Sequence, residues 1–182
     1  MISSRRFKAT ATDGRTLEGY ASIYGAPSGT IREIGRTFTE TIQRGAFDAS
    51  LAAGGDVKLY FQHDPSMPLA RTQSGTLTLR SDEKGLKFSA ELPDTTLGND
   101  VRTMLQRGDL SGEMSFGFAV RADEWNKEKT FRAVTRADLY EVSIVVDAAY
   151  PQTSSSLRDA GRLTNARVLT LRARSHNVTA PD

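Results

Sequence analysis

The sequence predicts a mainly β domain with a few helices, an α+β chain whose strands form a closed or nearly closed barrel with the helices packed outside. Two observations lead to this class. Short segments rich in β-branched and aromatic residues follow one another along most of the chain, and turn residues separate them. So many short strands need partners at their edges, and closure of a sheet into a barrel supplies those partners.

The expected strands are recognised by apolar residues that alternate with polar ones. They are two strands joined at Asp13-Gly14 within 5–24, single strands at 36–42 and 56–63, a hairpin at 75–92, and strands at 111–125 and 129–151 joined by the polar turn 126–129. An Asp-Gly pair favours the positive φ of a tight hairpin turn, which supports the first hairpin.

Two segments have the spacing of an amphipathic helix. The first, at 44–55, places Phe47 and Leu51 four residues apart and predicts about two turns. The second, at 94–108, is the clearer helix, because its apolar residues recur every three or four positions and Gly108 follows as a C-cap.

The composition excludes several classes of protein. The chain has no cysteine and only two histidines, so disulfides, thiolate nucleophiles and a histidine-rich metal site are not expected, and we predict no cofactor. A net charge of +2 does not by itself indicate nucleic-acid binding. No apolar run approaches the roughly 20 residues that span a bilayer, so we expect no membrane contact and a cytoplasmic location.

Residues 1–150 form the predicted domain, and residues 151–182 differ from it in composition. Serine and threonine come first after Pro151, and arginines follow. Segments of this composition at a chain end are often poorly packed, so we interpret 151–182 as a flexible tail.

His63 is the candidate general base. Hydrolysis of an amide needs a nucleophile, a base, a group that orients the base, and donors for the oxyanion. His63, in "LYFQHDPSMPLAR", is the only histidine within residues 1–150. Because imidazole is the side chain that titrates near neutral pH, activity is expected to rise between about pH 6 and 7.

Ser115 and Glu141 are the candidate nucleophile and orienting acid. In "GEMSFGF", alternation places Ser115 and Gly117 on the face opposite the apolar side chains, and a glycine there would let a substrate backbone come close. In "DLYEVSIVVD", Glu141 lies opposite a face made of Tyr140, Val142, Ile144 and Val146. A lone carboxylate inside an apolar strand calls for a partner, and an imidazolium would supply one.

Each of these residues also has a structural interpretation that the pattern leaves open. A histidine at the end of a strand is more often a surface or capping group than a base, and a serine on a strand is usually only small and polar. Glutamates usually face solvent, and Glu141 would do so on a half-exposed strand.

Taken together, the segments resemble the prohead maturation proteases of tailed bacteriophages and, more distantly, the herpesvirus assemblins. The resemblance rests on "GYASIYG", "TETIQRGAFDASL", "LYFQHDPSMPLAR", "RGDLSGEMSFGF" and "DLYEVSIVVDAAYP", in that order across about residues 15–155. It implies an assemblin-type barrel and a serine endopeptidase with His63 as base and Ser115 as nucleophile. Assemblins use a second histidine as the third member, and the only other one here is His176, so Glu141 is preferred, followed by Asp147, Asp138 and Asp64.

The resemblance also implies a substrate and a place of action. The enzyme would cut scaffold, or the scaffolding segment of the major capsid protein, and itself, inside the prohead in the host cytoplasm or in a bacterium that carries a prophage. The tail at 151–182 would then carry a self-cleavage site or a contact to scaffold. Backbone N–H groups near Ser115 or in the loop around Arg71 are the candidate oxyanion donors.

Two other functions compete with this one. A non-catalytic β-barrel module could bind scaffold or capsid protein, and self-association would fit either function; only the enzyme needs His63, Ser115 and Glu141 together. The arginines between positions 158 and 174 could contact nucleic acid, but they lack aromatic residues for base stacking, so no specific nucleic-acid partner is expected.

Overall fold

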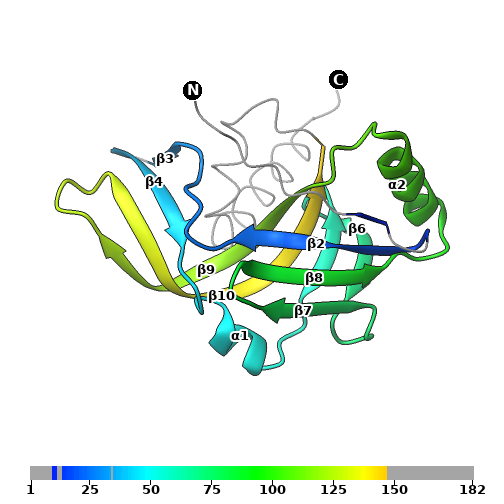
Figure 1. Ribbon diagram of the computed structural model, residues 1–182, viewed down its shortest axis with the longest axis horizontal. Helices are drawn as coiled ribbons and strands as arrows, with labels where there is room; N and C mark the ends of the chain where they lie inside the picture. The colour runs from blue at the N-terminus through cyan, green and yellow to red at the C-terminus, as the bar shows by residue number, and fades with distance from the viewer. Residues whose placement is uncertain (1–9, 12–13, 34, 147–182) are drawn as a thin grey trace, which may run out of the picture.

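Strands form most of the computed structural model, which describes residues 10–11, 14–33 and 35–146 (Figure 1). The elements are β1 Thr10–Ala11, β2 Thr16–Ile23, β3 Ile31–Glu33, β4 Arg36–Ile42, α1 Asp48–Ala52, β5 Lys58–Phe61, β6 Asp64–Arg71, β7 Leu77–Ser81, β8 Gly85–Glu91, α2 Thr96–Arg107, β9 Glu113–Trp125 and β10 Phe131–Val145. The predicted tail at 151–182 lies outside the described residues. Neither helix is long and apolar enough to cross a membrane.

The strands form two sheets. One has the order β1-β2-β8-β7, and the other has the order β3-β4-β10-β5-β6 with β9 also paired to β10. The mainly β prediction is confirmed, and both helices lie at the periphery (Figure 1). The prediction of a closed barrel is wrong for the described residues, because one sheet curls into a half-barrel and no strand ladder joins it to the other sheet. The assemblin-type arrangement stays a prediction.

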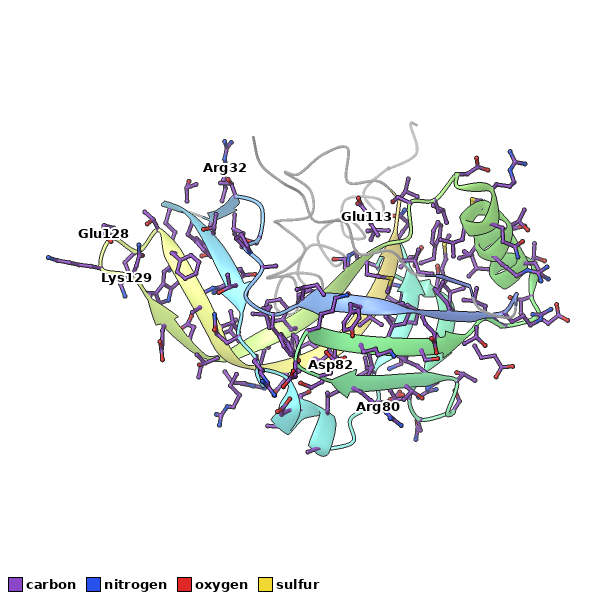
Figure 2. All side chains as sticks on the ribbon, in the orientation of Figure 1. Arg32, Arg80, Asp82, Glu113, Glu128 and Lys129 are labelled. Carbon is purple, nitrogen blue, oxygen red and sulfur yellow. The ribbon has the colours of Figure 1, made fainter. Side chains whose placement is uncertain are left out.

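The long strand β10 organises the second sheet. Its first part pairs in parallel with β4 at Phe131–Val134, and its last part pairs in parallel with β5 at Glu141–Ile144. Strand β9 pairs along its other edge in antiparallel fashion. The turn of that hairpin, where Figure 2 labels Glu128 and Lys129, lies at the end opposite Glu113. β10 therefore brings residues from β5 and β9 to the same stretch, Glu141–Val145.

Helix α1 lies between β4 and β5 in the chain and covers the middle of β10. The Ala137 N–H donates to the Ala46 carbonyl at 2.8 Å, and the Leu139 N–H donates to Ser50 Oγ at 3.0 Å. These bonds satisfy backbone groups of β10 where neither β4 nor β5 pairs with it. The crossover from β4 to β5 is thus held against β10, which helps to place the start of β5 beside it.

The core lies between the two sheets and is centred on aromatic and branched side chains. Phe47 is fully buried and packs edge-to-face against Phe116 and Phe118, with ring centroids 5.8 and 6.2 Å apart. Burial of one such side chain contributes about 1.5–3 kcal/mol. Because Phe116 and Phe118 point into this core, the residues between and beside them on β9 face the other way.

Most predicted elements are confirmed, and α2 matches its sequence signals closely. Thr95 caps its N-terminus by accepting the Gly98 N–H at 3.2 Å, and Gly108 ends it with a φ of 82°. Two predictions are wrong. The sequence predicts a loop directly after His63, but Asp64–Arg71 form strand β6, which tolerates Pro65 and Pro68 because it lies at the edge of its sheet.

The second error concerns the predicted apolar face of β10. Val142 and Ile144 are buried as expected, but Tyr140 and Val146 are exposed, at 45% and 47%. The register of β9 against β10 shifts between Leu139 and Glu141, and this irregularity turns Tyr140 outward while Leu139 is buried. Glu141 remains on the face opposite Val142.

A buried ion pair stabilises the end of the sheet that is far from Glu141. Arg132 on β10 donates to Glu40 on β4 through Nε at 3.1 Å and Nη2 at 2.5 Å, and the side chains are only 7% and 2% exposed. The same guanidinium lies over the ring of Trp125, 5.5 Å from its centroid. Removal of one partner of such a pair leaves the other charge buried and uncompensated.

Arg132→Gln is therefore expected to lower the free energy of unfolding by about 3–5 kcal/mol, as measured by urea denaturation. Arg36→Gln is the matched control, because Arg36 also stacks on Trp125, at 4.8 Å, but is 47% exposed. Arg36→Gln should lower the free energy of unfolding by about 1 kcal/mol or less. Equal losses for the two variants would show that burial of the ion pair does not carry the effect.

Candidate active site

His63 lies in the two-residue turn between β5 and β6. Phe61 and Asp64 pair across this turn, so Gln62 and His63 are its central residues, with φ values of 58° and 57°. Positive φ at both central residues is the pattern of a type I′ turn, which normally holds Asn and Gly. Left-handed backbone at two larger residues costs free energy and is typical of functional sites. The turn carries His63 just beyond the end of β5, beside β10.

His63 and Glu141 form a direct hydrogen bond. His63 Nδ1 lies 2.6 Å from Glu141 Oε1, and the two side chains are only 14% and 17% exposed. Because an ionised carboxylate can only accept, this contact favours the imidazole tautomer with Nδ1 protonated, in which Nε2 of the neutral ring can accept a proton. The sequence prediction named these two residues, and the structure brings them together.

Glu141 is held from two further sides. Ser143, two residues later on β10 and fully buried, donates from Oγ to Glu141 Oε2 at 2.6 Å. A Cβ on Gly117 would lie 2.7 Å from Glu141 Oε1 and 3.1 Å from its Cγ. The prediction that Gly117 leaves room for a substrate backbone needs correction, since the Glu141 side chain occupies that space.

Ser115 lies on the same face of the sheet as Glu141. It is directly opposite Ser143 in the register of β9 and β10, and Gly117 is opposite Glu141. Side chains of directly opposed residues project from the same side of a sheet, with Cα atoms about 4.5–5.5 Å apart. No hydrogen bond joins Ser115 Oγ to His63 among the described residues. Such contacts are often long before substrate binds.

The other acids named from the sequence have different partners. Asp138 binds Arg121, whose Nε lies 2.6 Å from Asp138 Oδ2. Asp64 accepts from the Ser66 hydroxyl at 2.7 Å and from its N–H at 2.8 Å, and these bonds lower the pKa of the carboxyl. Asp147 and His176 lie outside the described residues. Glu141 is thus the acid that contacts His63 in the described part of the chain.

In the loop around Arg71, the amides of Arg71 and Thr72 already have hydrogen-bond acceptors. The Arg71 N–H donates to Thr76 Oγ1 at 3.0 Å, and the Thr72 N–H donates to the Val57 carbonyl at 2.9 Å. The Arg71 guanidinium binds Asp56 and, with Lys58, lowers the pKa of that carboxyl to about 2. Arg71 pairs with Lys58 at the start of β5, whereas His63 follows the end of that strand. Both observations count against this loop as the source of oxyanion donors.

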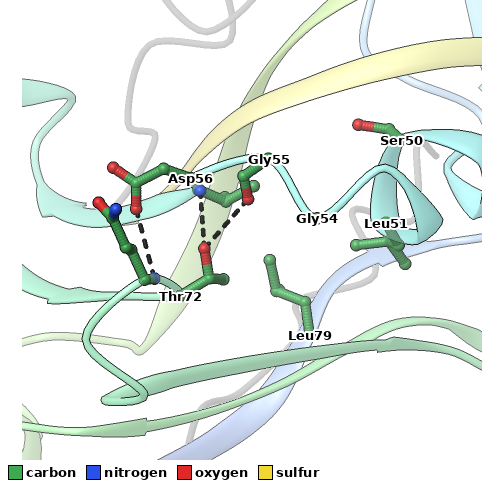
Figure 3. A pocket seen from close by; sticks show the side chains of 9 residues that line it. Ser50, Leu51, Gly54, Gly55, Asp56, Thr72 and Leu79 are labelled. Carbon is green, nitrogen blue, oxygen red and sulfur yellow. Dashed lines mark hydrogen bonds between the residues drawn. The ribbon is translucent and has the colours of Figure 1, made fainter.

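A pocket of about 320 Å³ lies beside α1 (Figure 3), and His63 is not among the residues that line it. It is lined by the α1–β5 connection, including Gly54 and Gly55, and by Thr72, whose Oγ1 accepts the Val57 N–H and donates to the Gly55 carbonyl. A second hollow shares Gly55 and Asp56 with this pocket and reaches the exposed Tyr140. Among the residues that the structure describes, no three acidic or histidine side chains lie together as metal ligands.

Sequence reasoning missed the groups that support the pair. Ser143 appeared only as a polar residue between Val142 and Ile144, and its two-residue spacing from Glu141 was the signal that the two side chains share a face. The positive φ of His63 had no sequence signal, because Gln62 and His63 are not the residues that a type I′ turn normally holds.

Comparison with known proteins supports the chemistry that this geometry suggests. The family model described as caudovirus prohead serine protease matches residues 3–165 of the 182-residue chain. No curated protein and no solved structure matched. The family implies a serine peptidase role in phage capsid maturation and a place in the phage capsid interior within a host cell, with capsid-related partners. The match covers most of the chain, and the chain therefore belongs to the caudovirus prohead serine protease family.

Proposed function

We propose that the chain is a serine endopeptidase that cuts scaffold, or the scaffolding segment of the major capsid protein, with Ser115, His63 and Glu141 as its catalytic residues. The observation that carries this assignment is the hydrogen bond from His63 Nδ1 to Glu141 Oε1, on the face of the sheet where Ser115 lies. The family membership supplies the reaction class. The prohead is the expected site of action.

In the first half of the reaction, Ser115 Oγ attacks the scissile carbonyl carbon. His63 Nε2 takes the hydroxyl proton as the new C–O bond forms, and the carbonyl electrons move onto the oxygen. Glu141 holds the Nδ1 proton and stabilises the imidazolium. Collapse of the tetrahedral intermediate breaks the C–N bond, and His63 Nε2 gives its proton to the leaving amine.

The second half repeats these steps with water. His63 Nε2 takes a proton from the water that attacks the acyl carbon, and it returns that proton to Ser115 Oγ as the ester bond breaks. Backbone N–H groups near Ser115 are the remaining candidates for oxyanion donors. Because proton transfer runs only through Nε2, the reaction depends on Nδ1 keeping its proton.

The test is incubation of the protein with the major capsid protein and the scaffold of its own phage, followed by mass spectrometry of the fragments. We expect one or a few defined cleavage sites with the native chain and intact protein with Ser115→Ala. If both forms leave every substrate intact while circular dichroism shows them folded, the non-catalytic assembly module becomes the better assignment.

We also expect the enzyme to cut its own tail at 151–182. Val145, the last residue of β10, lies opposite Glu113, two residues from Ser115 on β9, which is about 7 Å at strand spacing. A segment tethered this close has a high effective concentration at the nucleophile. The expected result is loss of C-terminal mass at a rate independent of protein concentration.

Mass spectrometry of purified protein over a tenfold range of concentration measures this rate. The Ser115→Ala form should keep its full mass. Identical termini in the two forms would remove self-cleavage from the proposal, and a rate proportional to concentration would show cleavage between molecules.

A further inference from the structure

The hydroxyl of Ser143 contacts the acid of the proposed site and takes no part in the mechanism described above. Ser143 is fully buried, and its Oγ donates to Glu141 Oε2 at 2.6 Å. The other carboxylate oxygen, Oε1, bonds His63 Nδ1 at 2.6 Å. Since each oxygen has its own donor, and the donors come from β10 and from the β5–β6 turn, the plane of the carboxylate is fixed.

We propose that Ser143 is a positioning residue: its hydroxyl orients the Glu141 carboxylate, which in turn holds His63 with Nδ1 protonated and Nε2 ready to accept. This inference rests on the peptidase function proposed above and extends the site by one residue. Ser143 does not touch the substrate or the reacting atoms. Its effect passes through Glu141 and His63.

Gly117 completes the support from the neighbouring strand. It lies opposite Glu141 on β9, and a Cβ there would come within 2.7 Å of Glu141 Oε1. Any larger residue at this position would push the carboxylate off the line between Ser143 and His63. Ser143 and Gly117 thus hold the same carboxylate, one by a hydrogen bond and one by leaving space.

A purely structural role for Ser143 makes a different prediction. A buried hydroxyl needs a hydrogen-bond partner, and Glu141 Oε2 could serve only that need. In that case, loss of the hydroxyl would change stability and leave the histidine ring as it is. If Ser143 is a positioning residue, loss of its hydroxyl frees the Glu141 carboxylate to rotate. The proton of the neutral His63 ring then distributes between Nδ1 and Nε2.

The experiment reads the tautomer of His63 by ¹⁵N NMR of the imidazole ring in the full chain. The chain has two histidines, and His176 lies in the tail that self-cleavage would remove, so the Ser115→Ala background, which keeps the tail, supplies it as an internal reference. We expect neutral His63 to carry its proton on Nδ1 in the native chain and to gain Nε2–H tautomer in Ser143→Ala. In the same variant, kcat for a peptide substrate should fall about 10- to 100-fold with KM nearly unchanged, because a hydrogen bond to a charged group is lost.

Three further variants make the result decisive. Ser143→Thr keeps the hydroxyl and should restore both the tautomer and most of kcat. Ser22→Ala is the matched control, since Ser22 is a buried serine on β2 in the other sheet. It should change neither the tautomer of His63 nor kcat. Gly117→Ala displaces the carboxylate without touching Ser143, so it should shift the tautomer even if Ser143→Ala does not fold.

The outcomes separate this inference from the peptidase assignment. A tautomer and a kcat that stay unchanged in folded Ser143→Ala, or in folded Gly117→Ala, overturn the positioning role and leave the peptidase intact. A native chain without peptidase activity overturns the proposed function. Even then, a tautomer shift in Ser143→Ala would show that Ser143 orients His63 through Glu141.

Discussion

Ser115→Ala is expected to reduce kcat for peptide cleavage by about 10⁴- to 10⁶-fold and to leave KM and the fold unchanged. The reason is that the acyl-enzyme cannot form without Oγ, and only the background rate from substrate binding and oxyanion stabilisation remains. The side chain is small and half-buried on β9, so its loss opens no large cavity. Steady-state kinetics on a peptide that spans a mapped cleavage site measure the effect.

Ser89→Ala is the matched control for this variant. Ser89 is also a half-buried strand serine, but it bonds Glu18 Oε1 at 3.1 Å in the other sheet. It should keep kcat within about twofold. A fluorophosphonate probe should add its mass to Ser115 in the native chain and not in His63→Ala. Labelling of a different serine, or full activity of Ser115→Ala, would assign the nucleophile elsewhere.

The local pattern of the sequence predicted most of the strands and the face on which each candidate lies. Phe116 and Phe118 are buried and Ser115 is opposite them because side chains alternate along a strand, and this rule needs only neighbouring residues. The same rule failed at Tyr140, where a register irregularity shifts the alternation. Bulges depend on the partner strand, so a single segment does not reveal them.

The pairing of distant segments could not be predicted. β10 pairs in parallel with both β4 and β5 along one edge, and this arrangement places His63 beside Glu141. Alternation identifies a strand but not its neighbour, so the sequence could nominate the two residues without showing that they touch. The family resemblance supplied the order of the motifs, and the contact between the two side chains required the three-dimensional arrangement.

The contribution of Ser143 and Gly117 lay beyond sequence reasoning for a similar reason. Both residues look ordinary in a strand, and their importance arises from atoms within about 3 Å on one carboxylate. From the sequence, Gly117 predicts space for a substrate backbone, because a glycine in a strand indicates a close approach but does not identify the approaching group. The approaching group is the Glu141 side chain.

Glu141→Gln is expected to lower kcat about 10⁴-fold, close to 5.5 kcal/mol of transition-state stabilisation. The amide has nearly the same shape, so the side chain keeps its place between Ser143 and Gly117. It carries no charge to stabilise the imidazolium. Its NH₂ group can also donate to His63 Nδ1, which moves the ring proton to Nε2 and blocks transfer from Ser115.

The matched control for this variant is Asp138→Asn, which neutralises another β10 acid that is paired with Arg121 rather than with His63. Its kcat should stay within about twofold of the native value. Glu141→Asp is shorter by one methylene, so its carboxylate cannot reach Ser143 and His63 at the native distances. Its kcat should lie between the kcat of the native chain and that of Glu141→Gln. If Glu141→Gln retains more than about a tenth of the native kcat, another residue orients His63, and Asp147 becomes the next acid to test. A loss that appears in Glu141→Gln and not in Asp138→Asn would tie the effect to the carboxylate that contacts the imidazole, because both changes remove one negative charge from the same strand.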